Sequence, residues 1–154
     1  MTAQQQARRV AAFFERFGPQ DLAFLDEWYH EDAAFKDPFN DVRGIAAIRQ
    51  VYSHMFETLQ DPRFTVWRCT AAEGECWLAW RFSFGSGSGT SVVAGASHLE
   101  FGADGRIAIH RDYWDPAEEI YEKVPVLGWV MRAIRRRLGA PQRQGSGSPD
   151  AAKV

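Results

Sequence analysis

The chain has 154 residues, of which 45% are hydrophobic, and a formal net charge of −2. This length and composition suit a single domain with a sizeable core. A slightly acidic balance gives no general attraction to phosphate backbones, so nucleic acid is not expected as a partner. Apolar runs stay shorter than the roughly 18 residues of a membrane-spanning helix, and the first residues lack a charged-then-apolar leader. We therefore predict a soluble cytoplasmic protein.

Two helices are predicted at the start of the chain. The first should end at Gly18-Pro19 and carries apolar residues at helical spacing: Val10, Phe13, Phe14 and Phe17. The second would turn four residues inward: Leu22, Leu25, Trp28 and Tyr29. A short strand over 33–37 follows and ends at Pro38, because proline cannot donate to a strand ladder. After Gly44, a third helix is predicted with an apolar and aromatic inner face.

From Phe64 onward the pattern changes to period two, which predicts four successive antiparallel strands. The last strand ends in the polar and aromatic run 110–115. Side chains alternate along a strand, so His110, Asp112 and Trp114 share one side. An ionisable Asp beside Trp on an inward face must be hydrogen-bonded or paired. Such surroundings are typical of a general acid or base, and Asp112 is our first candidate catalytic residue.

The C-terminal part of the chain has two distinct compositions. Residues 126–138 show the pattern of an amphipathic helix with arginines largely away from its apolar side. The favoured interpretation is a docked helix with a solvated basic face, and contact with an anionic membrane surface is the less favoured alternative. Residues 140–154 are polar and rich in Gly, Ser, Pro and Ala, which predicts disorder. The expected domain therefore spans 1–139 and includes the helical extension.

Cysteine, metal-ligating and aromatic residues limit the chemistry further. Cys69 and Cys76 flank a predicted turn and, in a chain without a secretion signal, are expected to be free thiols. No His, Cys and carboxylate group has ligand spacing, so neither a metal nor another cofactor is predicted. Aromatic residues make up 14% of the chain, which suits an apolar cavity walled by rings. A large aromatic core is the alternative at about even odds.

The element order, the segment Asp37-Pro38-Phe39-Asn40 and the run from Gly105-Arg106-Ile107 to Tyr113-Trp114 resemble the nuclear transport factor 2-like superfamily. Within it, the chain looks most like SnoaL-like and ketosteroid isomerase-like proteins. The resemblance covers roughly 7–115. It implies an α+β fold in which a strongly bent, mostly antiparallel sheet wraps around N-terminal helices as a cone. The apolar interior of such a cone holds a small molecule, and many members dimerise through the sheet.

Resemblance to ketosteroid isomerases covers half of their mechanism. Their general base lies in an Asp-Pro pair at the end of the first strand, which Asp37 and Pro38 match, although Asp-Pro is also an ordinary turn. Their oxyanion hole needs a Tyr and an un-ionised Asp, and by spacing those places fall on Phe13 and Ser97. Losing one such donor commonly costs about 3 kcal/mol. The sequence therefore argues against steroid isomerisation.

Resemblance to SnoaL-like cyclases is closer, because they pair an Asp on the last strand with a His on the neighbouring strand. Asp112 and His98 occupy those elements, although alternation places His98 on the face opposite Ser97 unless a bulge intervenes. Limonene epoxide hydrolases pair a similar Asp with an Arg and a second Asp. Here Arg81 is available, but no carboxylate stands where the second one is needed, which argues against two-carboxylate activation of water.

Two functions are consistent with these patterns. In the first, the protein is a cofactor-independent isomerase, cyclase or hydrolase-type enzyme that uses Asp112, assisted by Asp37 or His98, to transfer a proton. The candidate substrate-binding residues are His110, Trp114, Trp80, Phe13, Tyr52, Phe56 and Asn40. In the alternative, the protein is a non-catalytic ligand-binding or interaction module of the same fold. In both, a hydrophobic small molecule and a second copy of the chain are the expected partners.

Overall fold

The computed structural model describes residues 1–85 and 87–116. The predicted basic helix over 126–138, the tail over 140–154 and the domain boundary at 139 lie outside the described residues. The helices are α1 (Ala3–Arg16), the 3-10 helix η1 (Pro19–Glu27), α2 (Ile45–Thr58) and the short 3-10 helix η2 (Gly87–Gly89). The strands are β1 (Tyr29–Lys36), β2 (Asp41–Arg43), β3 (Arg63–Ala72), β4 (Glu75–Phe84), β5 (Ser91–Phe101) and β6 (Ile107–Tyr113).

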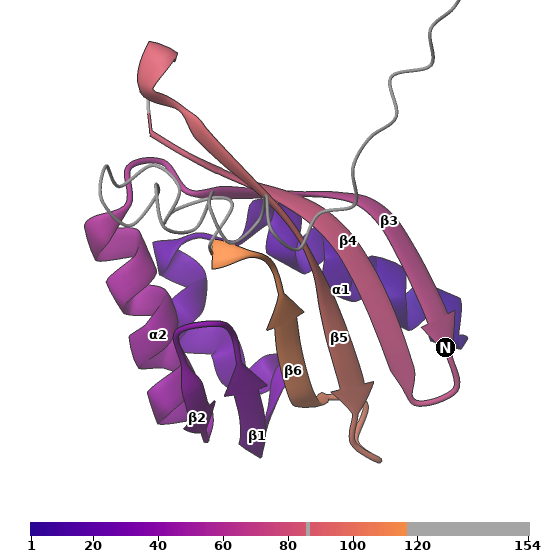
Figure 1. Cartoon of the computed structure of the whole chain (residues 1–154). Helices are drawn as coiled ribbons and strands as arrows, with labels where there is room; N and C mark the ends of the chain where they lie inside the picture. The colour runs from indigo at the N-terminus through magenta and orange to yellow at the C-terminus, as the bar shows by residue number, and fades with distance from the viewer. Residues whose placement is uncertain (86, 117–154) are drawn as a thin grey trace, which may run out of the picture.

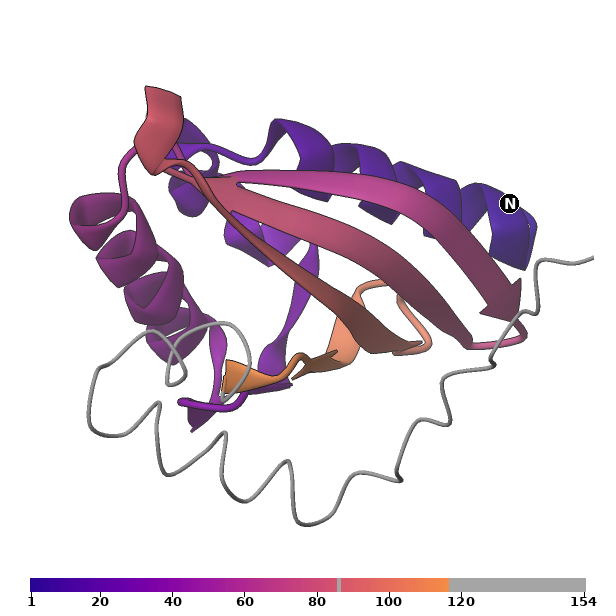
Figure 2. The same ribbon diagram turned by 45° about the horizontal axis from the view of Figure 1, so that its top comes forward.

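The strands form one curled sheet in the order β2-β1-β6-β5-β4-β3 (Figure 1). All neighbouring pairs are antiparallel except β1 and β6, which run parallel. Register shifts in β1, β3 and β5 mark irregularities of the kind that bend a strand. The sheet curls over α1, and α2 lies at the other end beside β1 and β2 (Figure 2). The predicted α+β fold, a bent, mostly antiparallel sheet around N-terminal helices, is confirmed.

The N-terminal helix forms because its sequence satisfies both its end and its buried face. Thr2 Oγ1 accepts a hydrogen bond from the Gln5 amide, and the Gln5 side chain accepts one from the Thr2 amide, so the first turn is capped. The buried side of α1 consists of Ala7, Val10, Ala11, Phe13 and Phe14. Together with Phe17, these side chains pack inside the curl of the sheet. α1 thereby supplies much of the core behind the site.

One prediction about the segment before the first strand was wrong. The predicted second helix is present as a 3-10 helix, and Phe24 inside it has non-helical dihedral angles (φ −111°, ψ 18°). Tyr29 does not belong to this helix but begins β1, where it pairs with Ile107 of β6. The strand is longer than the sequence indicated because its first half is held by this partner from the far end of the chain. That pairing cannot be read from local periodicity.

Both cysteines are free thiols, as predicted. Cys76 is fully buried, and burial raises the pKa of its thiol to about 12. Cys69 is partly exposed. Across the described part of the chain, no helix combines the length and the apolar character that crossing a membrane requires. A cytoplasmic location stays a prediction.

Candidate functional site

A cavity of about 320 Å³ lies between α2 and the inner face of the sheet. Most of its wall is apolar or aromatic, and the few polar groups come from the β1–β2 turn, from α2 and from the end of β6. Its lining residues include Val51, Tyr52, Met55, Phe64, Trp80, Phe82, Phe84, Val93 and Trp114. Its volume is at the lower end of the range for small-molecule sites. A concave apolar space with a few convergent polar groups is what a ligand site requires.

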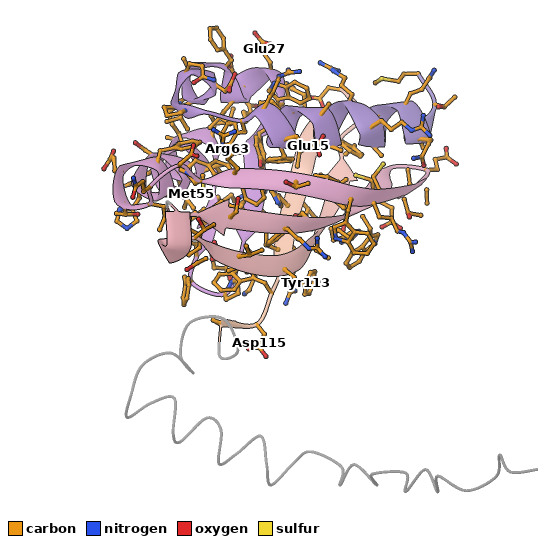
Figure 3. The ribbon with its side chains drawn as sticks, turned by 90° about the horizontal axis from the view of Figure 1, so that it is seen from above. Glu15, Glu27, Met55, Arg63, Tyr113 and Asp115 are labelled. Carbon is orange, nitrogen blue, oxygen red and sulfur yellow. The ribbon has the colours of Figure 1, made fainter. Side chains whose placement is uncertain are left out.

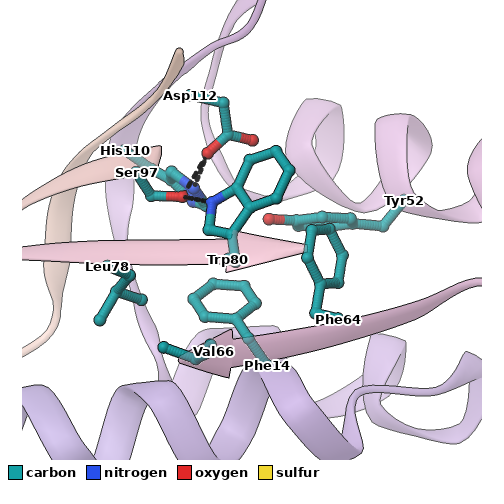
Figure 4. Close-up of a pocket in the computed structure, with 9 residues that line it drawn as sticks. All are labelled: Phe14, Tyr52, Phe64, Val66, Leu78, Trp80, Ser97, His110 and Asp112. Carbon is teal, nitrogen blue, oxygen red and sulfur yellow. Dashed lines mark hydrogen bonds and ion pairs between the residues drawn. The ribbon is translucent and has the colours of Figure 1, made fainter. Parts of the chain in front are cut away.

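Asp112 is the centre of a hydrogen-bond network beside this cavity (Figure 4). Its Oδ1 accepts from Ser97 Oγ at 2.5 Å and lies 2.9 Å from His110 Nε2. Ser97 in turn accepts from the indole Nε1 of Trp80 at 2.8 Å. Among the described residues, both hydrogen bonds of the carboxylate therefore fall on Oδ1. Oδ2 has no hydrogen-bond partner among the described residues.

The network continues behind His110 into the core. His110 Nδ1 lies 2.7 Å from the hydroxyl of Tyr29, which lies 2.9 Å from the hydroxyl of Tyr52. A carboxylate only accepts, so His110 Nε2 must carry a proton in the bond to Asp112. In the neutral imidazole, Nδ1 then accepts from Tyr29, and the Tyr29 oxygen accepts from Tyr52. In this series of hydrogen bonds, from Tyr52 through Tyr29 and His110, every donor consequently points toward Asp112.

Burial keeps both phenols protonated. Desolvation raises the pKa of Tyr29 well above its ordinary value, and the negative charge of Asp112 adds to the effect. Desolvation likewise raises the pKa of Tyr52, and the nearby Tyr29, Asp112 and Asp37 add to it. At neutral pH the two hydroxyls are therefore hydrogen-bond donors and carry no charge. A small void of about 10 Å³ adjoins Tyr52, His110 and Asp112, with room for about one water molecule.

Asp37 lies beside Asp112 at the edge of the same cavity. β1 and β6 pair Phe35 with His110 and Lys36 with Arg111, so Asp37 and Asp112 directly follow the last paired positions of the two parallel strands. Both side chains also line the same cavity, which places them at one end of it. The Asp37 carboxylate closes the turn into β2 by accepting from the amides of Phe39 and Asn40 and from the Asn40 side chain. Asp37 thus both stabilises the turn and lines the cavity.

Most of the residues predicted for the site are brought together. Asp112 and Asp37 line the cavity with Asn40, Tyr52, Trp80 and Trp114. His110 lies directly behind them, where it contacts Asp112. Phe13 is fully buried and stacks on Trp28 at 4.1 Å between ring centroids, and Phe56 packs against Phe17. Neither Phe13 nor Phe56 lines the cavity.

His98 lies away from Asp112, on the outer face of the sheet. Its Nε2 is 2.7 Å from a carboxylate oxygen of Glu75, and its ring stacks on Trp77 at 4.6 Å. Trp77 also stacks on Tyr113, which Figure 3 shows on the opposite side of the sheet from Glu15 of α1. Strand alternation alone predicted this face for His98, and no bulge between Ser97 and His98 changes it. The expectation that His98 assists Asp112 is therefore not supported by its position.

Sequence reasoning does not identify Ser97 as a partner of Asp112 or Tyr29 as a partner of His110. Ser97 contacts Asp112 directly. Tyr29 was assigned to a helix, yet it hydrogen-bonds His110 from β1. A polar Ser between apolar neighbours of an inward strand face was the available signal for the first. Nothing local indicated the second, because its partner is 81 residues away.

Gly95 gives the Trp80 ring the space that it needs. The two residues are paired across β4 and β5, and a Cβ built at Gly95 would lie 2.3 Å from the ring. We expect Gly95→Ala to displace this buried ring and weaken its bond to Ser97, with a loss of about 1–3 kcal/mol in unfolding free energy. Urea denaturation measures this loss. Ala94→Gly, at an exposed neighbouring position, is the control for a backbone effect, and equal loss in both variants would contradict the steric explanation.

No group of three or more His, Cys, Asp or Glu residues is arranged to hold a metal ion within residues 1–85 and 87–116. The polar groups of the cavity are instead two carboxylates, an amide, a phenol, a threonine and His54 at the rim. A carboxylate with one fully hydrogen-bonded oxygen and one free oxygen can take or give a proton. Proton transfer is the chemistry that these side chains can perform themselves.

The bent sheet and the apolar cavity with a polar network at one end agree with the fold of the nuclear transport factor 2-like superfamily. A family model described as the SnoaL-like domain matches residues 10–110. The match spans more than half of the 154 residues, so the chain belongs to the SnoaL-like domain family. No curated protein matches the chain.

Two solved structures show the same fold. An LEH-like epoxide hydrolase from M. tuberculosis has a TM-score of 0.64 at 19% identity, covering 86% of this chain and 97% of its own. A hypothetical protein with a ketosteroid isomerase-like fold from Catenulispora acidiphila, in complex with trimethylamine, has a TM-score of 0.64 at 14% identity, covering 77% and 92%. Identities this low establish the shared fold and leave the reaction to the site.

Proposed function

We propose that the protein is a cofactor-independent acid/base enzyme that acts on an apolar small molecule, with Asp112 as the group that transfers the proton. One observation carries this proposal. Asp112 lines the cavity, the donors around it converge on Oδ1, and Oδ2 has no hydrogen-bond partner among the described residues. Preorganised donors stabilise the carboxylate and fix its direction. The free oxygen is then placed to remove a proton from a bound molecule.

The residues around Asp112 would have different roles in this reaction. His110 and Ser97 hold the carboxylate and are positioning residues, because neither needs to touch the substrate. Asp37, the next side chain across the strand pair, is the candidate for assisting Asp112. Trp80 and Trp114 would contact the apolar part of the substrate. This assignment replaces His98 with His110 as the histidine of the site.

The proposed reaction is of the isomerase, cyclase or hydrolase type, and the residues of the site argue against two particular reactions. A steroid-type enolate needs strong donors at the places of Phe13 and Ser97, but Phe13 has none and Ser97 donates to Asp112. Epoxide opening by an Asp-Arg-Asp set needs an inward arginine, whereas Arg81 is exposed and pairs with Ala94 on the outer face. Abstraction of a proton followed by rearrangement or loss of a leaving group requires neither the strong enolate donors nor the inward arginine.

The probe 5-nitro-1,2-benzisoxazole tests this function without knowledge of the natural substrate. A base removes its ring C–H proton, the electron pair of that bond forms a nitrile, the N–O bond breaks, and a coloured nitrophenolate is released. We expect the full chain to accelerate this ring opening, and Asp112→Asn to reduce the second-order rate by about 10²-fold or more. Asp32→Asn, at an exposed position of β1, is the matched control. An unchanged rate in Asp112→Asn would refute the proposed role.

A second copy of the chain is the partner that we propose for the outer face of the sheet. This face exposes Trp67, Trp77, Val92, Ile109 and Tyr113. It also carries both acidic and basic side chains, among them Glu75, Glu100, Arg68 and Arg111. A face that combines exposed apolar side chains with charges of both signs suits self-association about a two-fold axis.

Trp77→Glu is expected to convert such a dimer to a monomer, because it places a charge in the middle of the apolar face. Sedimentation velocity or light scattering measures the mass. Phe24→Glu, an equally drastic change at an exposed residue of η1, should leave the mass unchanged. A wild-type chain that is monomeric at high concentration would contradict the proposal.

A further inference from the structure

The wall of the cavity has an unbalanced charge. Asp37 and Asp112 both line it, and no lysine or arginine does so among the described residues. His54 at the rim is the one lining side chain in the described ranges that can become positively charged. Two neighbouring carboxylates at one end of an apolar cavity repel each other. Such a pair is costly unless something compensates the negative charge.

Backbone amides, an amide side chain, a hydroxyl and an imidazole hold the two carboxylates. Asp37 accepts from two backbone amides and from the Asn40 side chain, and Asp112 accepts from Ser97 and His110. These donors solvate the carboxylates but bring no full positive charge when the imidazole is neutral. With a neutral imidazole, no described side chain of the cavity wall except His54 can then supply a positive charge to offset the two carboxylates.

The basic side chains nearest in sequence have other partners. Lys36 Nζ lies 2.6 Å from Asp41, and the Arg111 guanidinium lies over the Tyr113 ring at 4.8 Å from its centroid. Strand alternation turns Lys36 and Arg111 away from the side that carries Asp37 and Asp112. Both side chains border a second, more open pocket beside Asp37 and Asp112, but neither lines the apolar cavity.

The rest of the wall suits an organic cation. Trp80, Phe82 and Phe84 present rings on the sheet side, and Trp114 meets Phe39 edge-on at 5.3 Å at the end where the carboxylates lie. Aromatic faces attract cations most strongly where water is excluded. An apolar wall with rings and two carboxylates at one end matches a molecule with a hydrophobic body and a single positively charged end.

We propose that the ligand of this cavity is an apolar organic cation whose ammonium group lies between Asp37 and Asp112, with its hydrophobic part against Trp80 and Trp114. This inference rests on the proposed function and adds to it the chemical class of the substrate. A cation held there also favours removal of a proton from the adjacent carbon, because its charge offsets the negative charge that develops.

A matched pair of probes tests the charge directly. 2-Naphthylmethylamine, which is protonated at pH 7.5, and the isosteric neutral 2-naphthylmethanol are titrated into the full chain at 150 mM salt by calorimetry. We expect the amine to bind about tenfold more tightly or better. Asp37→Asn and Asp112→Asn should each reduce this preference, and the double variant should abolish it. Asp32→Asn removes one charge elsewhere and should leave the preference intact.

The outcomes separate the inference from the proposed function. Equal or tighter binding of the alcohol overturns the cation and leaves the cavity as a ligand site. A preference that survives in both Asp variants also overturns it, because the cation then lies elsewhere on the acidic chain. Binding of neither probe at millimolar concentration contradicts both the inference and the assignment of the cavity. Preference for the amine that falls in each single variant, is lost in the double variant and persists in Asp32→Asn establishes it.

Discussion

Asp112→Ala should lower the free energy of unfolding by about 2–4 kcal/mol, because it removes the acceptor on which two inward donors depend. Ser97 Oγ and His110 Nε2 both donate to Asp112 Oδ1, and both residues are almost fully buried. Each buried donor left without a partner costs roughly 1–3 kcal/mol, and access of water from the cavity reduces the sum. Urea or thermal unfolding of the purified variant measures the loss.

Asp112→Asn separates this structural role from proton transfer. Its amide oxygen can still accept from Ser97 and His110, so the expected destabilisation is under about 1.5 kcal/mol. It cannot act as a base, so stability and activity should diverge between the two variants. Equal stability of Asp112→Ala and Asp112→Asn would contradict the importance of the convergent donors.

Tyr29→Phe is expected to cost about 1–3 kcal/mol and to disturb the site without touching the ligand. The change leaves His110 Nδ1 without its donor in the core and frees the imidazole to rotate or change tautomer. We therefore expect loss of stability together with altered chemical shifts of the His110 ring, read by NMR of the imidazole nitrogens.

Tyr52→Phe is the matched control, since it removes a hydroxyl one step further along the same network. Tyr29 keeps its bond to His110 in this variant, so the shifts of His110 should change little. If Tyr52→Phe moves the His110 resonances as much as Tyr29→Phe does, the hydroxyls do not act in the order inferred from the distances.

Strand periodicity predicted the inner side of the site well. A strand alternates its side chains rigidly, so His110, Asp112 and Trp114 could be assigned to one face from the residues alone. The structure places Asp112 and Trp114 on the cavity and His110 behind them. The same rule placed His98 on the opposite face, and it proved more reliable than the position that the cyclase resemblance gave to that residue.

Contacts between distant segments were beyond the reach of the sequence. Tyr29 meets His110, and Asp37 lies beside Asp112, only because β1 pairs in parallel with β6, about 75–80 residues further along the chain. Parallel pairing across such a separation leaves no local pattern. The sequence indicated both carboxylates as candidates, but it could not show that they face the same cavity as neighbours.

Function in this chain depends on whether the cavity beside Asp112 is where a small molecule binds, and its tryptophans report on this directly. Trp80 and Trp114 line the cavity, whereas Trp67 and Trp77 are exposed on the other side of the sheet. We would record the indole N–H signals of the ¹⁵N-labelled full chain during titration with 5-nitroindazole, an unreactive analogue of the benzisoxazole probe. The expected result is saturable movement of the Trp80 and Trp114 signals while those of Trp67 and Trp77 stay in place. Movement confined to Trp67 and Trp77, or no movement at saturating probe, would contradict the assignment of the cavity as the ligand site.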